Sequence, residues 1–266
     1  MLLPMLRGRW RRYLKQISYA TARALSTFNI PHEYVFILSH MRSGSSLLTH
    51  ILVSNPAVLG YGETMTRYAD NRDFELLALK IQWVLRRFPL RGPERYLLDK
   101  LLHDVLLSPD ELELLVEHNV RLIFLLREPA SSIASLIRSL EYSPEDAVRY
   151  YTLRLKRLEQ LANRAPPGHP VFCLTYQDLL NDTGPTLERL RSFLALQMPL
   201  SEQYQILPTT GRRGIGDFSS KIRAGRIVRE PTQAAPVAEL VPSQWLHQAQ
   251  ETYHQTLSRL SRFQSP

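Results

Sequence analysis

The sequence of 266 residues has a single cysteine, Cys173, so no disulfide can form within the chain. Cys173 lies in an apolar run, Val171 to Leu174, where we expect a buried free thiol. The chain also lacks the run of about twenty apolar residues that a membrane-spanning helix requires. The apolar residues at its start are followed by arginine too soon for a secretory signal, which favours a cytoplasmic location.

Extremes of composition are absent as well. Hydrophobic residues make up 44% and charged residues 22%, which is typical of a soluble globular protein. The length is sufficient for a hydrophobic core that needs no disulfide or metal. With no internal repeat and no second domain in the pattern, we expect one domain over residues 33–266, preceded by a basic extension.

The extension, residues 1–32, interleaves arginine and lysine with aromatic and aliphatic residues. A basic amphipathic helix of this kind favours either peripheral contact with an anionic membrane surface or packing of one face on the domain. The net charge of +8 suits an anionic ligand, although excess lysine and arginine also keeps proteins in solution. We expect no nucleic-acid partner.

A strand, a tight loop and a helix follow the extension. Tyr34 to Leu38 is an apolar run typical of a buried parallel strand, and apolar residues recur at helical spacing from Leu47 to Leu52. Between them lies a turn rich in serine and glycine. Such a loop directs backbone N–H groups and hydroxyls to the N-terminus of a helix, where the dipole favours negative charge, so it predicts a phosphate site.

The loop lacks the lysine that a Walker A motif carries directly after its last glycine. Ser45 follows Gly44, and the nearest cation, Arg42, precedes it. A nucleotide-binding loop without that lysine is less typical of a protein that binds ATP or GTP with magnesium. We therefore expect no metal site.

Two further buried strands, Val120 to Leu126 and Val171 to Tyr176, alternate with helical patterns. This alternation predicts an α/β protein with a three-layer P-loop NTPase-like fold and a central parallel sheet. Ligands bind at the carboxyl ends of such strands, and Arg127 lies at one of these ends. An arginine there favours a second anion, hence a nucleotide with two separated phosphate groups.

Residues 42–48, Arg-Ser-Gly-Ser-Ser-Leu-Leu, resemble the 5′-phosphosulfate loop of the sulfotransferase family. Arg127 and Ser135, eight positions apart, resemble the family's pair for the 3′-phosphate of the donor. Residues 174–180 are similar to its Tyr-Glu-Asp-Leu segment, and residues 216–226 to a late loop that closes over the donor. The resemblance covers residues 34 to about 262 and is closest to the tyrosylprotein and bacterial branch around the expected base.

The resemblance implies a donor, 3′-phosphoadenosine 5′-phosphosulfate (PAPS), and residues that bind it. Arg42 would lie at the leaving phosphate and the sulfuryl oxygens. The 5′-phosphate would be held by the loop residues Ser43, Gly44, Ser45, Ser46 and Leu47. The 3′-phosphate or the adenine edge would be held, beyond Arg127 and Ser135, by Lys221, Arg223 and Gly225.

The resemblance also implies the catalytic groups. Glu63 follows the loop at the interval of the base in the tyrosylprotein branch, and Lys100 matches a lysine that would lie near the sulfuryl group. The alternatives are a turn carboxylate paired with Arg67 and a lysine on a helix face. Cytosolic small-molecule sulfotransferases use a histidine as base, so the rivals of Glu63 are His40, His50 and His103.

The function implied is PAPS-dependent sulfotransfer to a hydroxyl-bearing acceptor such as a glycan, lipid, natural product or peptide tyrosine, with adenosine 3′,5′-bisphosphate as product. Ser45 and Ser46 replace the family's usual Thr-Thr but keep the hydroxyls, and no motif identifies the acceptor. Two alternatives stay open at this point. One is a P-loop nucleotide kinase, and the other is a module that binds a nucleotide or anion without catalysis.

Overall fold

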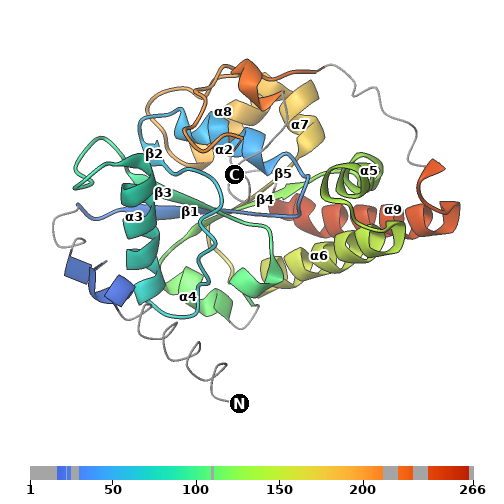
Figure 1. Cartoon of the computed structure of the whole chain (residues 1–266), viewed down its shortest axis with the longest axis horizontal. Helices are drawn as coiled ribbons and strands as arrows, with labels where there is room; N and C mark the ends of the chain where they lie inside the picture. Colours follow the sequence, from blue (N-terminus) through green and yellow to red (C-terminus); the bar gives the residue numbers. More distant parts are fainter. Residues whose placement is uncertain are drawn as a thin grey trace, which may run out of the picture.

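The computed structural model describes residues 17–21, 23–24, 30–108, 111–211, 221–229 and 239–263. Within these ranges a five-stranded, all-parallel sheet in the order β2-β3-β1-β4-β5 lies between two layers of helices (Figure 1). The predicted three-layer α/β fold is therefore confirmed. The strands are β1 (Glu33–Ser39), β2 (Val58–Leu59), β3 (Tyr96–Leu101), β4 (Arg121–Leu126) and β5 (Val171–Thr175).

The helices divide between the two faces of the sheet (Figure 1). One face is covered by α2 (Ser45–Val53), α7 (Tyr176–Asn181) and α8 (Thr183–Phe193). The other is covered by α3 (Arg72–Leu85), α4 (Leu112–Glu117), α5 (Pro129–Leu140), α6 (Pro144–Arg164) and α9 (Ser243–Leu260). Short 3-10 turns are η1 (Asp104–Leu106), η3 (Ile222–Ala224) and η5 (Ser261–Phe263).

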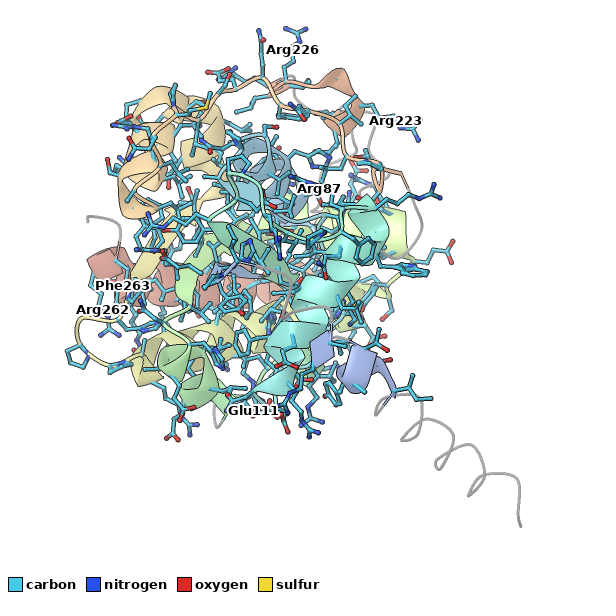
Figure 2. The ribbon with its side chains drawn as sticks, turned by 90° about the vertical axis from the view of Figure 1, so that its left-hand side faces the viewer. Arg87, Glu111, Arg223, Arg226, Arg262 and Phe263 are labelled. Atoms are coloured by element: carbon cyan, nitrogen blue, oxygen red, sulfur yellow. The ribbon has the colours of Figure 1, made fainter. Side chains whose placement is uncertain are left out.

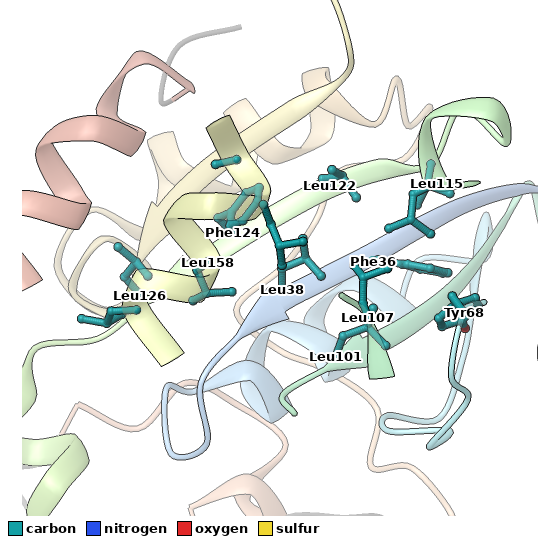
Figure 3. Packing of buried hydrophobic residues seen from close by; sticks show 14 of the residues in the cluster. Phe36, Leu38, Tyr68, Leu101, Leu107, Leu115, Leu122, Phe124, Leu126 and Leu158 are labelled. Atoms are coloured by element: carbon teal, nitrogen blue, oxygen red, sulfur yellow. The ribbon is translucent and has the colours of Figure 1, made fainter. Parts of the chain in front are cut away.

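Strand β1 is apolar along its length because both of its faces are buried. Phe36 and Leu38 pack in the cluster with α3, α4 and α6, whereas Val35 and Ile37 pack in the cluster with α2, α7 and α8. All four side chains are 0% exposed. Figure 3 shows Leu38 beside Phe124 and other leucines on the α6 side of the sheet. A parallel sheet with two covered faces requires this continuous hydrophobic pattern.

The sequence pattern assigned no element to residues 95–100, and the structure shows that all of them except Arg95 belong to β3. Near its end the strand has a polar pair, Asp99 and Lys100, before the last residue Leu101, and this pair interrupts the apolar run that would have marked it as buried. Both side chains are nevertheless buried, at 0% and 4% exposure. Strand β3 pairs with β1 in parallel, so its polar end lies beside the end of β1.

Two expectations concern Cys173 and the N-terminal extension. Cys173 is a buried free cysteine as predicted, and burial raises the pKa of its thiol to about 12. Of the extension, the described residues include Tyr19, which is buried and donates a hydrogen bond of 2.5 Å to Asp73 of α3. No helix among the described residues has the length and apolar character needed to cross a membrane.

The interface between the sheet and α6 gives a test of the fold. Phe124 of β4 is fully buried there, so Phe124→Ala should lower the free energy of unfolding by about 3–5 kcal/mol through lost burial and a cavity. Urea denaturation followed by circular dichroism measures this. Leu153→Ala, at a residue of α6 that is 56% exposed, is the control and should change stability by less than about 0.5 kcal/mol. Equal effects would contradict the packing.

Candidate active site

The loop between β1 and α2 has a backbone that depends on glycine. Gly44 has φ of 93°, and a Cβ at this position would lie 2.3 Å from Cδ2 of Tyr176. Arg42 also adopts a left-handed conformation, with φ of 64°. A residue other than glycine in this region is strained and persists where the surrounding structure enforces it, often at a functional site. Tyr176, the first residue of α7, thus packs directly against the loop.

The N-terminus of α2 carries backbone donors for a ligand. Gly44 is its N-cap and supplies no side chain, and the first helical hydrogen bond runs from Leu48 N–H to Gly44 O at 3.2 Å. Ser45 N–H lies 3.3 Å from Ser43 Oγ. In the described part of the chain, the N–H groups of the next two residues, 46 and 47, have no acceptor. These donors and the helix dipole favour a bound anion.

Arg127 lies directly after β4, beside this loop. Its N–H donates to His40 Nε2 at 3.2 Å, its Nη1 donates to Arg42 O at 3.2 Å, and its guanidinium lies over the ring of Tyr176 at 4.2 Å. Among the described residues, buried Nε of Arg127 has no hydrogen-bond partner. Burial lowers the pKa of Arg127, and nearby Arg42 adds to this, so the group would gain from an anion.

Arg42 lies beside Ser135, a residue of α5. Its Nε donates a hydrogen bond of 2.8 Å to Ser135 Oγ. Since Arg127 also bonds to the backbone of Arg42, the structure brings together the two arginines and the serine that sequence analysis selected. Two positive charges and a hydroxyl from three separate elements thus converge next to the loop.

Lys100 contributes a third cation, on the other side of the loop. Its Nζ donates to Ser46 Oγ at 3.3 Å, at the first turn of α2. It belongs to the end of strand β3, so the alternative of a lysine on a helix face is wrong. Its ammonium group is held at the same helix terminus that presents the backbone donors.

Asp99, the residue before Lys100, anchors the turn that carries Glu63. Its Oδ1 accepts hydrogen bonds from Thr64 N–H at 3.0 Å and Lys100 N–H at 2.8 Å. Its Oδ2 accepts from Thr64 Oγ1 at 2.6 Å and Tyr68 OH at 2.7 Å. Burial raises the pKa of Asp99, and these hydrogen bonds oppose the rise by stabilising the carboxylate. The turn and β3 are therefore held in a fixed relation.

Glu63 lies next to a histidine. His103 Nε2 is 3.2 Å from Glu63 Oε1, without the angles of a hydrogen bond, and the two side chains are 34% and 12% exposed. Arg67 pairs instead with Glu111, at 2.9 Å, so the alternative that pairs Arg67 with Glu63 is wrong. Glu63 is thus a mostly buried carboxylate with a side-chain neighbour that can carry a positive charge.

The other two rival histidines are held by other contacts. His40 is fully buried, donates from Nδ1 to Met41 O at 2.8 Å and accepts from Arg127 N–H at Nε2. Burial lowers its pKa to about 4, and Arg127 and Arg154 contribute to this, so the ring is neutral at pH 7. His50 is 3% exposed, and its nitrogens lie 2.7 Å from Ser46 O and 2.8 Å from Thr210 Oγ1. Both rings are therefore held by contacts within the protein.

The late loop is described over residues 221–229, and residues 216–220 lie outside the described ranges. Arg223 is exposed and lies against Gly211, where a Cβ would be 2.7 Å from its Nη2. Figure 2 shows it on the outer edge of the molecule with Arg226. Gly225, with φ of 65°, accepts a hydrogen bond from Tyr204 N–H, and Lys221 is partly buried. No hydrogen bond joins Arg223 to residues 42–47 in the described part of the chain.

Comparison with known proteins decides the family. The model of the sulfotransferase family matches residues 65–200, which is half of the chain. The chain belongs to the sulfotransferase family. Its reaction class is therefore sulfuryl transfer, and the nucleotide-kinase alternative is not favoured. The matched segment includes Lys100, Arg127 and Ser135, whereas the loop and Glu63 precede it. No curated protein sequence matches this sulfotransferase.

One solved structure shows the same fold, and two others are similar to this chain at lower TM-scores. Mouse sulfotransferase SULT7A1, complexed with PAP, is 12% identical with a TM-score of 0.52, over 91% of this chain and 93% of that chain. The sulfotransferase domain of the Synechococcus PCC 7002 olefin synthase is 19% identical with a TM-score of 0.48, over 85% and 96%. Retinol dehydratase in complex with androsterone and PAP is 13% identical with a TM-score of 0.47, over 90% and 85%.

Sequence analysis assigned no role to two residues that contact the candidate site, Asp99 and Tyr176. Asp99 was missed because the pattern assigned no element to its segment, although its position beside Lys100 was a signal. Tyr176 stands in the segment that resembles Tyr-Glu-Asp-Leu, but its contact with Gly44 and Arg127 depends on the docking of α7 against the loop. The contacts of Asp99 with Thr64 and of Tyr176 with Gly44 join segments far apart in the sequence, so local spacing does not encode them.

The buried imidazole of His40 predicts a pH dependence of stability. Its pKa of about 4 lies below the usual 6.5, so in acid the unfolded chain takes up a proton that the folded state does not bind. Stability from this group is present above pH 6.5 and is lost as pH falls towards 4. We expect a loss of about 2 kcal/mol between pH 7 and pH 5, measured by urea denaturation.

The control for this prediction is His40→Asn, which has no titrating group at position 40. This variant should lack that part of the pH dependence, whatever its stability at pH 7. An equal loss in both proteins would show that other groups account for the acid sensitivity.

Proposed function

We propose that the protein transfers the sulfuryl group of 3′-phosphoadenosine 5′-phosphosulfate to a hydroxyl-bearing acceptor, without a metal. The observation that carries the proposal is Arg127, whose buried Nε lacks a partner among the described residues, whereas its Nη1 donates to Arg42 O and its guanidinium lies over the ring of Tyr176. It forms a second anion site beside the α2 terminus, as a donor with two phosphate groups requires. The fold is that of a mouse sulfotransferase solved with PAP.

The two anion sites differ in their residues. The N–H groups at the start of α2, the hydroxyls of Ser45 and Ser46, and Lys100 would hold the 5′-phosphosulfate. Arg127 and Ser135 would hold the 3′-phosphate. Arg42 was expected at the leaving phosphate, and its hydrogen bond to Ser135 now favours the 3′ side for its guanidinium. Lys100 is then the cation at the leaving group, where electrostatic stabilisation matters most.

Glu63 is the proposed general base. When bound, the donor supplies a sulfuryl group that bonds to the acceptor oxygen as its bond to the phosphate breaks. The acceptor must lose its hydroxyl proton, and Glu63 would receive it. Through Thr64 the turn that carries Glu63 is tied to Asp99, the neighbour of Lys100, so the base and the cation have one common anchor. His103, whose Nε2 is 3.2 Å from Glu63 Oε1, would help to hold the Glu63 carboxylate in place.

The proposal extends to the acceptor, the late loop and the location of the protein. The proposed acceptor is a hydroxyl-bearing molecule such as a glycan, lipid, natural product or peptide tyrosine. Roles for Lys221, Arg223 and Gly225 at the 3′-phosphate or adenine stay predictions, as do a cytoplasmic location and peripheral membrane contact through residues 1–32. Most of that extension lies outside the described ranges.

Binding measurements test the donor site. Calorimetric titration should show that adenosine 3′,5′-bisphosphate binds more tightly than 5′-ADP or ATP with Mg²⁺. In Arg127→Ala its affinity should fall about 10- to 100-fold, because a charge-assisted contact with the 3′-phosphate is lost.

Arg121→Ala is the matched control, since it removes the same charge from the amino end of the same strand. Arg121 donates to Phe193 O at 3.0 Å, on the opposite edge of the sheet from the proposed site. The affinity of Arg121→Ala for adenosine 3′,5′-bisphosphate should equal that of the wild type. A preference for ATP with Mg²⁺ would overturn the proposed donor.

Rate measurements test the base. Glu63→Gln should lower kcat about 10²- to 10⁴-fold, because the amide cannot accept the proton, while affinity for adenosine 3′,5′-bisphosphate is unchanged. Glu111→Gln, at the carboxylate that pairs with Arg67, is the control and should retain the wild-type rate. If Glu63→Gln is fully active, the base lies elsewhere and His103→Ala is the next variant to measure.

A further inference from the structure

Helix α6 carries a polar patch at the carboxyl end of the sheet. The patch consists of Tyr150, Tyr151 and Arg154, each of which bonds to backbone at the end of a strand. The rest of the inner face of α6 is apolar, with Leu155 and Leu158 at 0% exposure. None of these three side chains has a part in the donor site or the base proposed above.

Arg154 joins the ends of β1 and β3. Its side chain is 2% exposed, its Nε donates to Ser39 O at 2.9 Å and its Nη2 donates to Leu101 O at 2.7 Å. Its Nη1 lies 2.5 Å from Oδ1 of Asp104, the residue after His103. One guanidinium therefore spans the residue that ends β1, the residue after Lys100, and the turn beside the base.

Tyr150 makes a second link between the same two segments. Its hydroxyl accepts a hydrogen bond from Met41 N–H at 2.9 Å and donates one to Leu102 O at 3.1 Å. Met41 directly precedes Arg42, and Leu102 directly precedes His103. The neighbouring Tyr151 donates to Arg127 O at 2.6 Å, at the end of β4.

Stability alone does not account for a buried arginine at this position. Ion pairs in protein interiors are often matched or exceeded in stability by well-packed apolar residues, because charges lose hydration on burial. What the arginine and the two tyrosines provide is directional bonding at three strand ends. These ends lead into Arg42, Arg127 and the segment from Lys100 to His103, which come together only at this edge of the sheet.

We propose that Arg154 and Tyr150 are positioning residues for sulfuryl transfer. They fix the spacing between the loop with Arg42 and the segment with Lys100 and His103, while Tyr151 fixes the backbone of Arg127. The proposal rests on the proposed function for its catalytic consequence. Its structural consequence, a loop held from α6, does not depend on that function.

Tyr150→Phe is the first variant to measure, because it removes a hydroxyl and keeps the ring. Hydrogen exchange at the Met41 amide should become at least about 10-fold faster, since its acceptor is lost. With the melting temperature within a few degrees of wild type, kcat should fall about 10- to 100-fold. The Kd for adenosine 3′,5′-bisphosphate should change less than about 3-fold, because misplacement affects the transition state more than ground-state binding.

Tyr142→Phe is the matched control. The rings of Tyr142 and Tyr150 pack with centroids 6.0 Å apart, but within the described ranges Tyr142 makes none of the contacts to the strand ends. Exchange at Met41 and kcat should both equal the wild-type values. If the two tyrosine variants behave alike in exchange and kcat, the positioning proposal is overturned.

Arg154→Lys and Arg154→Met separate position from stability. Lysine keeps the charge but has one donor atom in place of the guanidinium fork, so it should restore part of the kcat lost in the methionine variant. If the methionine variant does not fold, Tyr150→Phe and Arg154→Lys still decide the question. If Tyr150→Phe and Arg154→Lys both retain the wild-type kcat, the positioning proposal is overturned. If the wild-type protein itself has no transfer activity, the proposed function is contradicted. In that case hydrogen exchange at the Met41 amide tests the positioning proposal alone.

Discussion

Parallel pairing of β1 between β3 and β4 is the constraint on which the site depends. Hydrogen bonding in register brings the carboxyl ends of three strands to one edge of the sheet. The residues that follow them are Arg42, Arg127 and, at the end of β3 itself, Lys100. This pairing thereby places three cations that are far apart in the sequence close to the N-terminus of α2.

Concentrating positive charge at one edge has an energetic cost, which the surrounding residues reduce. Arg127 donates to backbone oxygen and lies on the ring of Tyr176, and burial still lowers its pKa. Next to Lys100, buried Asp99 accepts four hydrogen bonds, which stabilise its carboxylate. An anionic donor would complete this balance, which is why affinity and local stability should be linked.

The layer behind the sheet contributes to the site as well as to the core. Helix α6 packs leucines against the strands and, at one end, bonds to the strand termini through Tyr150 and Arg154. A helix that covers a sheet face thus also determines how the loops at its edge are spaced. In a reaction that relies on alignment, such spacing affects rate more than ground-state binding.

By itself the sequence determined the layer architecture, because the buried strands and amphipathic helices each have a periodicity that one window of residues reveals. It also indicated the phosphate loop and Arg127, since glycine and a charge at a strand end have local causes. Only tertiary structure decided that Glu63 lies beside His103, that Arg42 bonds to Ser135, and that Arg154 spans two strand ends. These contacts join separate segments, and no local pattern specifies which segments meet.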